Sequence, residues 1–390
     1  MTGAVPVAAF YTPLKHPFDP EVSGDREIAR MLMGGLRAAG FAPELASRLL
    51  TWRRVFDPAD AERTERVAAF TAQTLVGRYR RRPRGRRPVV WMTYQNYYRC
   101  PDLLGPTVAT ALDVPYVLVD TSVSTKSRRT PFRPWVAAAR AALRRADLIF
   151  PSSPRDLPRL TALRGPVFAA ERLRLLPPAL DPARFTPDPA SRAARRATLL
   201  APDPPDTPLL LCVAMMRAAD KLDSYRLLAE ALAELVVERP SRPWRLVVAG
   251  DGPARPAVLA ALGRLPSGRV TLVGAVEPDA IAGLYASADL FVFPGLGEAL
   301  GLVYLEAAAA GLPVVACHGP GPDAMVVPGG GTLTAPTAPA LAGGLRRLLD
   351  DAPARARMGA AARRFVVEER SLRRFHETLR DGLARVGVPP

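Results

Sequence analysis

The sequence predicts an α/β protein made of two tandem, Rossmann-like units, each a doubly wound parallel sheet, that face each other across a cleft. Three observations support this fold class. With 390 residues, the chain is too long for one ordinary core. Short, continuously apolar runs alternate with longer amphipathic ones, as expected of parallel strands covered by helices on both faces. This alternation stops once, near the middle of the chain, and then starts again.

The predicted strands are the apolar runs, and each is followed by helical sequence. The first, VPVAAFY at 5–11, precedes the amphipathic run REIARMLMGGLRAAG. Because ligands of open parallel sheets bind at the carboxyl ends of strands, we expect the functional residues in the loops after each run. The predicted strands of the first half are 5–11, 88–94, 115–122 and 148–153, and those of the second half are 208–216, 244–252, 269–276, 290–295 and 313–319.

The interruption between the two series is a segment rich in Pro, Ala and Arg, FTPDPASRAARRATLLAPDPPDTP at 185–208. It has no strand period, and we interpret it as the linker. The predicted first unit is therefore 1–195 and the second is 205–370. The last helical run, about 371–390, is expected to complete the first unit.

Composition excludes several classes of protein. Three scattered cysteines, Cys100, Cys212 and Cys317, argue against a disulfide framework or a zinc site and fit the cytoplasm. No apolar run reaches the roughly 18 residues of a membrane helix. The first residues, MTGAVPVAAFYTPLKHP, show no basic leader followed by a long apolar stretch, so no signal peptide is expected.

The net charge of +16 lies entirely in the first half: residues 1–200 hold 33 basic and 17 acidic residues, and residues 201–390 hold 20 of each. The densest run is RYRRRPRGRR at 78–87. It is either a solvated loop or a surface for an anionic lipid or substrate, such as the inner face of a bacterial membrane. It lacks interleaved aromatic residues and any recognised nucleic-acid-binding motif, so we expect no nucleic-acid partner.

Three loops carry residues suited to phosphate chemistry. Ser23-Gly24-Asp25 opens a helix whose N–H groups and dipole favour an anion, although an ordinary helix start has the same pattern. Arg217 and Lys221 follow a strand and suit a diphosphate leaving group, with a solvated helix start as the alternative. VVAGDGP ends a strand in glycines but is no G-x-G-x-x-G fingerprint, so a nicotinamide cofactor has little support.

The stretch GEALGLVYLE, 297–306, places two carboxylates around a helix start. Glu298 precedes the predicted helix, and Gly301 and Leu302 present backbone N–H groups there. Glu306 lies inside the apolar run LVYLEAAAA, where a carboxylate is costly to bury without a partner. Ribose hydroxyls would be such a partner, and a buried salt bridge is the alternative. Gly311 and Pro313 end this helix.

These residues resemble a known family. LYASADLFVFPGLGEALGLVYLEAAAAGLPVVAC, 284–317, is similar to the Glu-x7-Glu region of the retaining glycosyltransferases of family 4, which have the GT-B fold. PPALDPARFTP, 177–187, resembles the family's segment at the end of its first domain, and VVAGDGP also matches. The resemblance covers most of residues 5–385.

The resemblance implies a role for each matching residue. Glu306 would bind the ribose of a nucleotide-sugar donor, and Glu298 would contact the transferred sugar. Arg217 and Lys221 would bind the diphosphate. Gly24 and the backbone of Gly301 and Leu302 would also contact the donor.

Three positions depart from the family pattern. Asp120 stands where the family usually has a histidine. The interval from Arg217 to Lys221 is shorter than usual, and Leu222 replaces a glycine. His318 stands where small residues are common, either to shape the sugar pocket or as a plain loop histidine.

The predicted function is transfer of a hexose-type sugar from a nucleoside-diphosphate sugar, with retention at the anomeric carbon. The predicted catalytic residues are Glu298, Arg217, Lys221 and Asp120. No pair of carboxylates is placed as in a hydrolase. No Asp-x-Asp occurs, so no metal and no other cofactor are expected. The alternatives are a nucleotide-sugar epimerase and a catalytically idle sugar-nucleotide-binding or scaffold protein.

The acceptor stays open between a sugar, a glycolipid and a polysaccharide. Tyr94, in TYQNYYR at 93–99, would offer a stacking ring, and Lys126 and Arg128 would bind a phosphate or carboxylate. The basic first half is consistent with an anionic or lipid-linked acceptor. The expected location is therefore the cytoplasm, with peripheral contact at the inner face of the membrane as an alternative.

Overall fold

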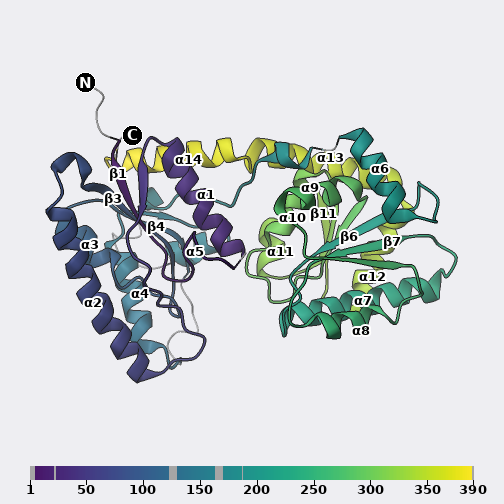
Figure 1. Cartoon of the computed structure of the whole chain (residues 1–390), viewed down its shortest axis with the longest axis horizontal. Helices are drawn as coiled ribbons and strands as arrows, with labels where there is room; N and C mark the ends of the chain where they lie inside the picture. The colour runs from purple at the N-terminus through teal and green to yellow at the C-terminus, as the bar shows by residue number, and fades with distance from the viewer. Residues whose placement is uncertain (1–4, 22, 123–129, 163–169, 187, 389–390) are drawn as a thin grey trace. The chain divides into compact units, whose positions relative to one another are not determined.

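The structure is a computed structural model, and it describes residues 5–21, 23–122, 130–162, 170–186 and 188–388. The chain divides into two compact units. The first comprises Met1–Pro178 and Leu372–Pro390, and the second comprises Ala179–Ser371. Figure 1 shows the helices and strands of each unit along the chain.

The first unit contains a five-stranded sheet with the order β2-β1-β3-β4-β5, in which every described strand pair is parallel. Its strands are β1 Val7–Tyr11, β2 Ala42–Leu45, β3 Pro88–Asn96, β4 Tyr116–Thr121 and β5 Leu148–Phe150. Its helices are α1 Gly24–Ala38, α2 Pro58–Arg80, α3 Gly105–Leu112, α4 Arg133–Arg145, α5 Asp156–Thr161 and α14 Leu372–Arg385, with short 3₁₀ turns η1 Arg84–Arg86 and η4 Ala170–Arg172.

The second unit contains a six-stranded parallel sheet with the order β11-β10-β9-β6-β7-β8. Its strands are β6 Leu209–Val213, β7 Arg245–Ala249, β8 Val270–Gly274, β9 Leu290–Val292, β10 Val314–Cys317 and β11 Gly331–Thr334. Its helices are α6 Pro189–Leu200, α7 Asp220–Glu238, α8 Arg255–Leu262, α9 Pro278–Ser287, α10 Leu302–Ala309, α11 Pro320–Met325, α12 Ala338–Asp350 and α13 Ala352–Glu369, preceded by the 3₁₀ turn η5 Pro182–Phe185.

Nine of these strands fall inside the predicted apolar runs, apart from the last two residues of β3. The other two, β2 and β11, were not predicted, because their sequences, APEL and GTLT, contain no continuous apolar run. An edge strand needs no continuous apolar run, and β2 even contains a proline, which such a position tolerates. The predicted fold class of two tandem doubly wound parallel-sheet units is confirmed.

The segment predicted to be a linker has a different structure. The units divide between Pro178 and Ala179, and all of 185–208 belongs to the second unit. Its central part is α6, which packs against α9. The buried Arg196 of α6 donates to the Ser287 carbonyl at 2.9 Å and to Asp289 Oδ2 at 2.8 Å. The arginine-rich segment was therefore predicted to be a linker, but it forms a docked helix. The sequence did not show this, because Ser287 and Asp289, which bind Arg196, lie about 90 residues away.

The C-terminal helix α14 packs against α1 in the first unit, and Figure 1 shows the two helices side by side. The close approach depends on Gly35, because a Cβ there would lie 2.8 Å from Leu379 Cδ2. Where the chain enters and leaves the second unit, Leu180 and Ser371 form a parallel bridge. The amide of Leu180 also donates to the Arg370 carbonyl at 3.0 Å.

Candidate functional site

The carboxyl edge of the second sheet brings together two of the predicted donor-binding residues. Lys221 lies in the first turn of α7, after β6, and Glu298 lies in the loop after β9. The Lys221 ammonium donates to Glu298 Oε2, although the residues are 77 positions apart in the sequence. The same ammonium lies 4.9 Å from the centre of the buried Phe293 ring. Both charged side chains keep about a fifth of their surface exposed, 23% for Lys221 and 18% for Glu298.

The loop that carries Glu298 is held by glycine geometry and by α7. Gly295 and Gly297 have φ of +74° and +63°. A Cβ on Gly295 would lie 2.0 Å from the Tyr304 hydroxyl, and one on Gly297 would lie 2.1 Å from Asp220 Oδ2. The Leu296 amide donates to Ser224 Oγ on α7 at 2.9 Å. Only residues without a side chain can therefore bring this loop against the start of α7.

Helix α10 begins immediately after this loop. Gly301 precedes it in the left-handed conformation, with φ of +76°, and no described side chain caps the helix. Leu302 is its first residue. The N–H groups at this start are of the kind that bind an anion when no capping side chain accepts from them.

Glu306 lies in the middle of α10 and is partly buried. The buried Tyr285 hydroxyl donates to Glu306 Oε2 at 2.8 Å. Burial, followed by the charge of Glu306, raises the pKa of Tyr285 well above its usual value. Sequence reasoning anticipated that this carboxylate needs a polar partner and missed the tyrosine, which lies 21 residues earlier.

Arg217 lies in the exposed loop between β6 and α7. The loop after β7 fixes its path, because the Met216 amide donates to the Asp251 carbonyl at 2.9 Å and the Ala254 amide donates to the Met216 carbonyl at 2.8 Å. Gly250 permits this approach: a Cβ there would lie 1.9 Å from the Ala214 carbonyl oxygen. The loop ends at Ala219, whose φ of +61° is unusual for a residue with a side chain.

In the first unit, Gly24 is the exposed first residue of α1, and the amide of Arg26 donates to the Ser23 hydroxyl at 3.3 Å. Asp120 lies at the end of β4 with φ of +54° and is partly buried. Burial raises the pKa of Asp120 to about 6, with smaller contributions from Asp25 and Asp156. Asp25 and Gln95 bind each other in the same unit: Gln95 Nε2 donates to Asp25 Oδ1 at 2.8 Å.

The predicted acceptor residues are not assembled by the described structure. Tyr94 is only 1% exposed, so its ring belongs to the core of the first unit rather than to a surface that a sugar can stack on. The prediction for Tyr94 is therefore wrong for this structure, because almost every residue of β3, on both faces of the sheet, is buried. Lys126 and Arg128 lie outside the described residues.

A cavity of about 410 Å³ lies at the other edge of the first sheet. Its lining comes mainly from the segments that precede β4 and β5, together with Arg172 and Val386. It contains none of the predicted site residues. Its polar side chains bind each other, since Arg145 donates to Asp147 Oδ2 at 2.8 Å. This cavity is separate from the loops at the carboxyl edge of either sheet.

The described ranges contain neither a candidate metal-binding group nor a candidate membrane-spanning helix. In these ranges no group of three or more His, Cys, Asp or Glu side chains is arranged to bind a metal ion. None of the helices there combines the length and the apolar character that crossing a bilayer requires.

Residues 207–351, which contain Arg217, Lys221, Glu298 and Glu306, match the family model described as glycosyl transferases group 1. This part of the chain is a group 1 glycosyltransferase domain. The resemblance stated from the Glu-x7-Glu region is thereby confirmed. The matched range begins just before β6 and ends with α12, so it includes every strand of the second sheet.

Curated relatives of the domain include two enzymes with related names. The chain is 36% identical over 241 residues to a D-inositol 3-phosphate glycosyltransferase of Kineococcus radiotolerans, an alignment that covers 55% of this chain and 54% of that protein. It is 32% identical over 248 residues to a GDP-mannose-dependent α-(1-6)-phosphatidylinositol monomannoside mannosyltransferase of Mycolicibacterium smegmatis, with coverage of 59% and 61%. The chain thus spans about half the length of the curated relatives it matches.

Solved structures resemble the whole chain. Sucrose-phosphate synthase of Thermosynechococcus elongatus matches with a TM-score of 0.71 at 19% identity, covering 99% of this chain and 100% of that one. Anabaena HepE, solved with UDP-glucose, matches with a TM-score of 0.69 at 17% identity, covering 97% and 99%. At such identities the likeness concerns the fold, which is that of the GT-B glycosyltransferases.

Proposed function

We propose that the protein is a glycosyltransferase that moves a sugar from a nucleoside-diphosphate sugar to an acceptor with retention of anomeric configuration. One observation carries the proposal. Lys221 and Glu298, predicted to bind the diphosphate and the sugar, meet at the carboxyl edge of the sheet in the glycosyltransferase domain. This edge is where open parallel sheets bind their ligands.

In the proposed reaction, the donor lies along the carboxyl edge of the second sheet. Glu306 accepts hydrogen bonds from ribose hydroxyls in addition to the one from Tyr285. Arg217, Lys221 and the amides that open α10 bind the diphosphate. These positive groups stabilise the charge that develops on the leaving phosphate as the glycosyl bond breaks. The leaving phosphate then accepts the proton of the acceptor hydroxyl, on the same face of the sugar, so that configuration is retained.

The decisive experiment is transfer by Arg217→Ala. Loss of one transition-state cation should lower kcat by about 10²–10³. Arg226→Ala is the matched control, because Arg226 is an exposed arginine on α7 whose described partner, Asp223, lies one turn away at 3.0 Å. Full turnover by a folded Arg217→Ala variant would refute the proposed role of this residue. Nucleotide binding without transfer or slow donor hydrolysis by the unmodified protein would instead favour an idle sugar-nucleotide-binding protein.

The proposed acceptor is a polyol that is anionic or linked to a lipid, in keeping with the names of the relatives and with the basic first half of the chain. The structure divides the arginines of the basic run into two groups. Arg78 and Arg82 bind Glu44 at 3.1 and 2.6 Å and contact the Tyr79 ring, so they stabilise the fold. The exposed arginines of the run are Arg80, Arg81, Arg84, Arg86 and Arg87.

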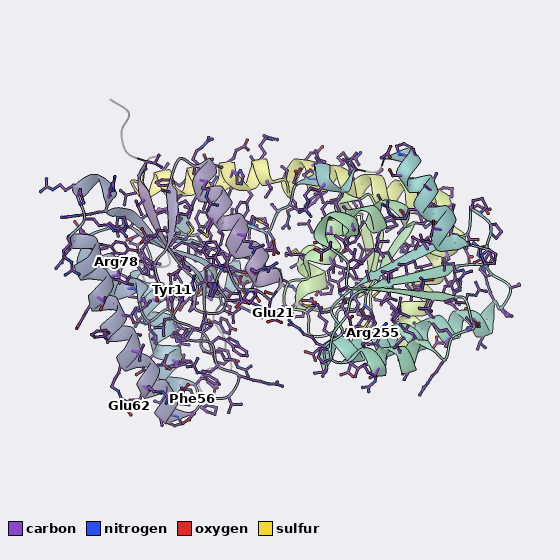
Figure 2. All side chains as sticks on the ribbon, viewed as in Figure 1. Tyr11, Glu21, Phe56, Glu62, Arg78 and Arg255 are labelled. Carbon is purple, nitrogen blue, oxygen red and sulfur yellow. The ribbon has the colours of Figure 1, made fainter. Side chains whose placement is uncertain are left out.

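We further propose that these exposed arginines bind the anionic inner face of the membrane. Sedimentation with vesicles, with and without acidic lipid, tests this. Arg84→Glu/Arg86→Glu should lose binding, since each such residue near the surface contributes about 1 kcal/mol. Arg63→Glu/Arg66→Glu is the control, because these residues lie near the other end of α2, where Figure 2 labels Glu62. Equal sedimentation with neutral and acidic vesicles would remove the membrane proposal.

A further inference from the structure

A tight turn follows β3 at the carboxyl edge of the first sheet. The Tyr97 amide donates to the Cys100 carbonyl at 3.2 Å, and the Cys100 amide donates to the Tyr97 carbonyl at 2.8 Å. Cys100 is fully buried, which anchors one end of the turn. The loop after β2 also binds the turn, since the Arg53 amide donates to the Arg99 carbonyl at 2.9 Å. The backbone of Arg99 is therefore held in place before any ligand binds.

The partly buried side chain of Arg99 lies against aromatic rings. Its guanidinium carbon is 5.6 Å from the centre of the Tyr98 ring and 5.7 Å from that of Phe132. A cation within about 6 Å of a ring centre is attracted by the face of the ring. Phe132 packs in turn on Phe56, which Figure 2 labels, with the ring centres 5.1 Å apart. The rings thus position the guanidinium without neutralising its charge.

This guanidinium has no anionic partner in the part of the chain that the structure describes. The Nε of Arg99 is buried without a hydrogen bond, and none of the described carboxylates forms an ion pair with the side chain. Three other described arginines with a buried, unbonded Nε each form an ion pair through a terminal nitrogen: Arg78, Arg174 and Arg242. Arg99 therefore differs from them in keeping an uncompensated charge.

Carboxylates on neighbouring segments are bound elsewhere. Asp102, in the same loop, accepts from the Thr93 hydroxyl at 2.6 Å. Asp60 of α2 accepts from Arg53 Nε at 2.5 Å. The protein therefore supplies rings and a fixed backbone to Arg99 but no counterion, and a ligand can provide one.

The chemistry of a guanidinium selects an oxyanion. It is weakly hydrated and presents a planar fork of N–H donors that matches two oxygens of a phosphate. Hydrogen bonds between such charged groups are the strong ones. A neutral hydroxyl would leave the positive charge uncompensated, and an ammonium would be repelled. A phosphate offers more acceptor oxygens than a carboxylate, so it is the better match.

We propose that Arg99 binds a phosphate ester of the acceptor at the carboxyl edge of the first sheet. The proposal rests on the proposed function, because it takes the ligand to be the acceptor of a glycosyltransferase. It assigns one residue to the anionic group that the net charge of the first half indicates only in general. Binding at Arg99 is measured without any turnover.

The test compares three soluble probes: myo-inositol, myo-inositol 1-phosphate and glycerophosphoinositol. The second carries a free phosphate monoester, and the third carries the phosphodiester of a lipid headgroup. Titration calorimetry on the full chain measures their dissociation constants, with the proposed donor site saturated by the nucleoside diphosphate that most raises the melting temperature. At least one phosphorylated probe should bind about 10- to 100-fold more tightly than myo-inositol, and the tighter one identifies the source of the phosphate.

Variants then assign the preference to this residue. Arg99→Gln should reduce it by about tenfold or more while leaving the affinities for myo-inositol and for the nucleoside diphosphate unchanged, whereas loss of a purely structural role would change all of them. Arg99→Lys keeps the charge but not the fork, so it should lower the preference severalfold. Arg66→Gln is the control, because Arg66 is an exposed arginine of the same unit whose described partner, Glu62, lies one turn away at 2.6 Å.

Equal affinity for all three probes, no measurable binding of any probe, or a preference that survives Arg99→Gln would overturn the subsite. Thermal unfolding checks that the variants fold; if Arg99→Gln does not, an unchanged preference in Arg99→Lys overturns it instead. A phosphate preference that depends on Arg99 in a protein that transfers no sugar would refute the proposed function and leave the subsite standing. Sugar transfer without the phosphate preference would do the reverse.

Discussion

Glu298→Gln tests the proposed donor site, because it should strengthen the binding of a nucleoside diphosphate and at the same time lower the rate of sugar transfer. In the structure, the two groups predicted to bind the donor bind each other: the Lys221 ammonium donates to Glu298 Oε2 and contacts the Phe293 ring. A diphosphate that binds Lys221 must compete with this carboxylate. Replacing the carboxylate with an amide of the same shape removes the competing charge.

The magnitude follows from the burial of the pair. Two unit charges about 4 Å apart at an effective dielectric constant near 20 attract by about 4 kcal/mol. Desolvation and lost side-chain freedom offset most of this, and each side chain is still about a fifth exposed. A net contribution of about 1–2 kcal/mol results, between the values for exposed and fully buried pairs. Without Glu298, a nucleoside diphosphate should therefore bind about 5- to 30-fold more tightly.

The assay uses the nucleoside diphosphate that most raises the melting temperature of the unmodified protein in a panel of nucleotides. Titration calorimetry then compares the two proteins. Sugar transfer should fall in Glu298→Gln, since the carboxylate that would contact the sugar is lost. Glu238→Gln is the matched control, because Glu238 forms an exposed pair with Arg346 in the same unit.

Unchanged or weaker binding of the diphosphate to a folded Glu298→Gln variant would refute this reasoning. It would mean that Lys221 does not bind the diphosphate, or that Glu298 positions the ammonium rather than competing for it. Lys221→Met separates these two explanations. If Lys221 binds the diphosphate, this variant loses affinity whether or not Glu298 is present.

Two further predictions concern stability. Gly250→Ala should lower the free energy of unfolding by about 3–5 kcal/mol, against about 1–2 kcal/mol for Gly274→Ala. Both glycines have positive φ, but only at Gly250 would the new Cβ collide with a backbone oxygen. Comparing the two variants by urea unfolding therefore separates the cost of backbone strain from the cost of the collision. Asp120 has a pKa raised to about 6 by burial, so its contribution to stability is complete below about pH 4 and is lost as pH rises through 6. Asp120→Asn should therefore be more stable than the unmodified protein at neutral pH by up to about 3 kcal/mol, with the two converging near pH 4; a constant difference across this range would contradict the assignment.

Much of the fold could be predicted because a buried parallel strand is a continuous apolar run that can be recognised in the local sequence. The runs that became β6 and β7 are almost continuously apolar and almost fully buried, so nine strands could be placed from sequence. The edge strands β2 and β11 could not, since neither APEL nor GTLT is a continuous apolar run. The predicted boundary between the units lies later in the sequence than the observed one. The reason is that the docking of α6 depends on partners of Arg196 that are distant in the sequence.

The candidate site, like the fold, could be predicted only in part from the sequence. The spacing of Glu298 and Glu306 around a helix start predicts a donor region. The match to the glycosyltransferase family model lies in the same part of the chain. No local pattern indicated that Tyr285 would bind Glu306 or that Gln95 would bind Asp25. Tyr94 was correctly placed at the end of the predicted strand 88–94, but its ring was expected to stack on a sugar, whereas it is buried.

By itself, the sequence determined most of the succession of strands and helices, and it predicts that the chemistry lies in the loops that follow the strands. Both are consequences of apolar periodicity and of the special backbone requirements of glycine. The tertiary structure alone decided which polar and charged groups meet, as in the pair of Lys221 with Glu298 and the pair of Asp25 with Gln95. The physical reason is that a parallel sheet gathers the ends of strands that are distant in sequence at one edge. Charge, burial and proton affinity there depend on neighbours that no single stretch of the chain contains.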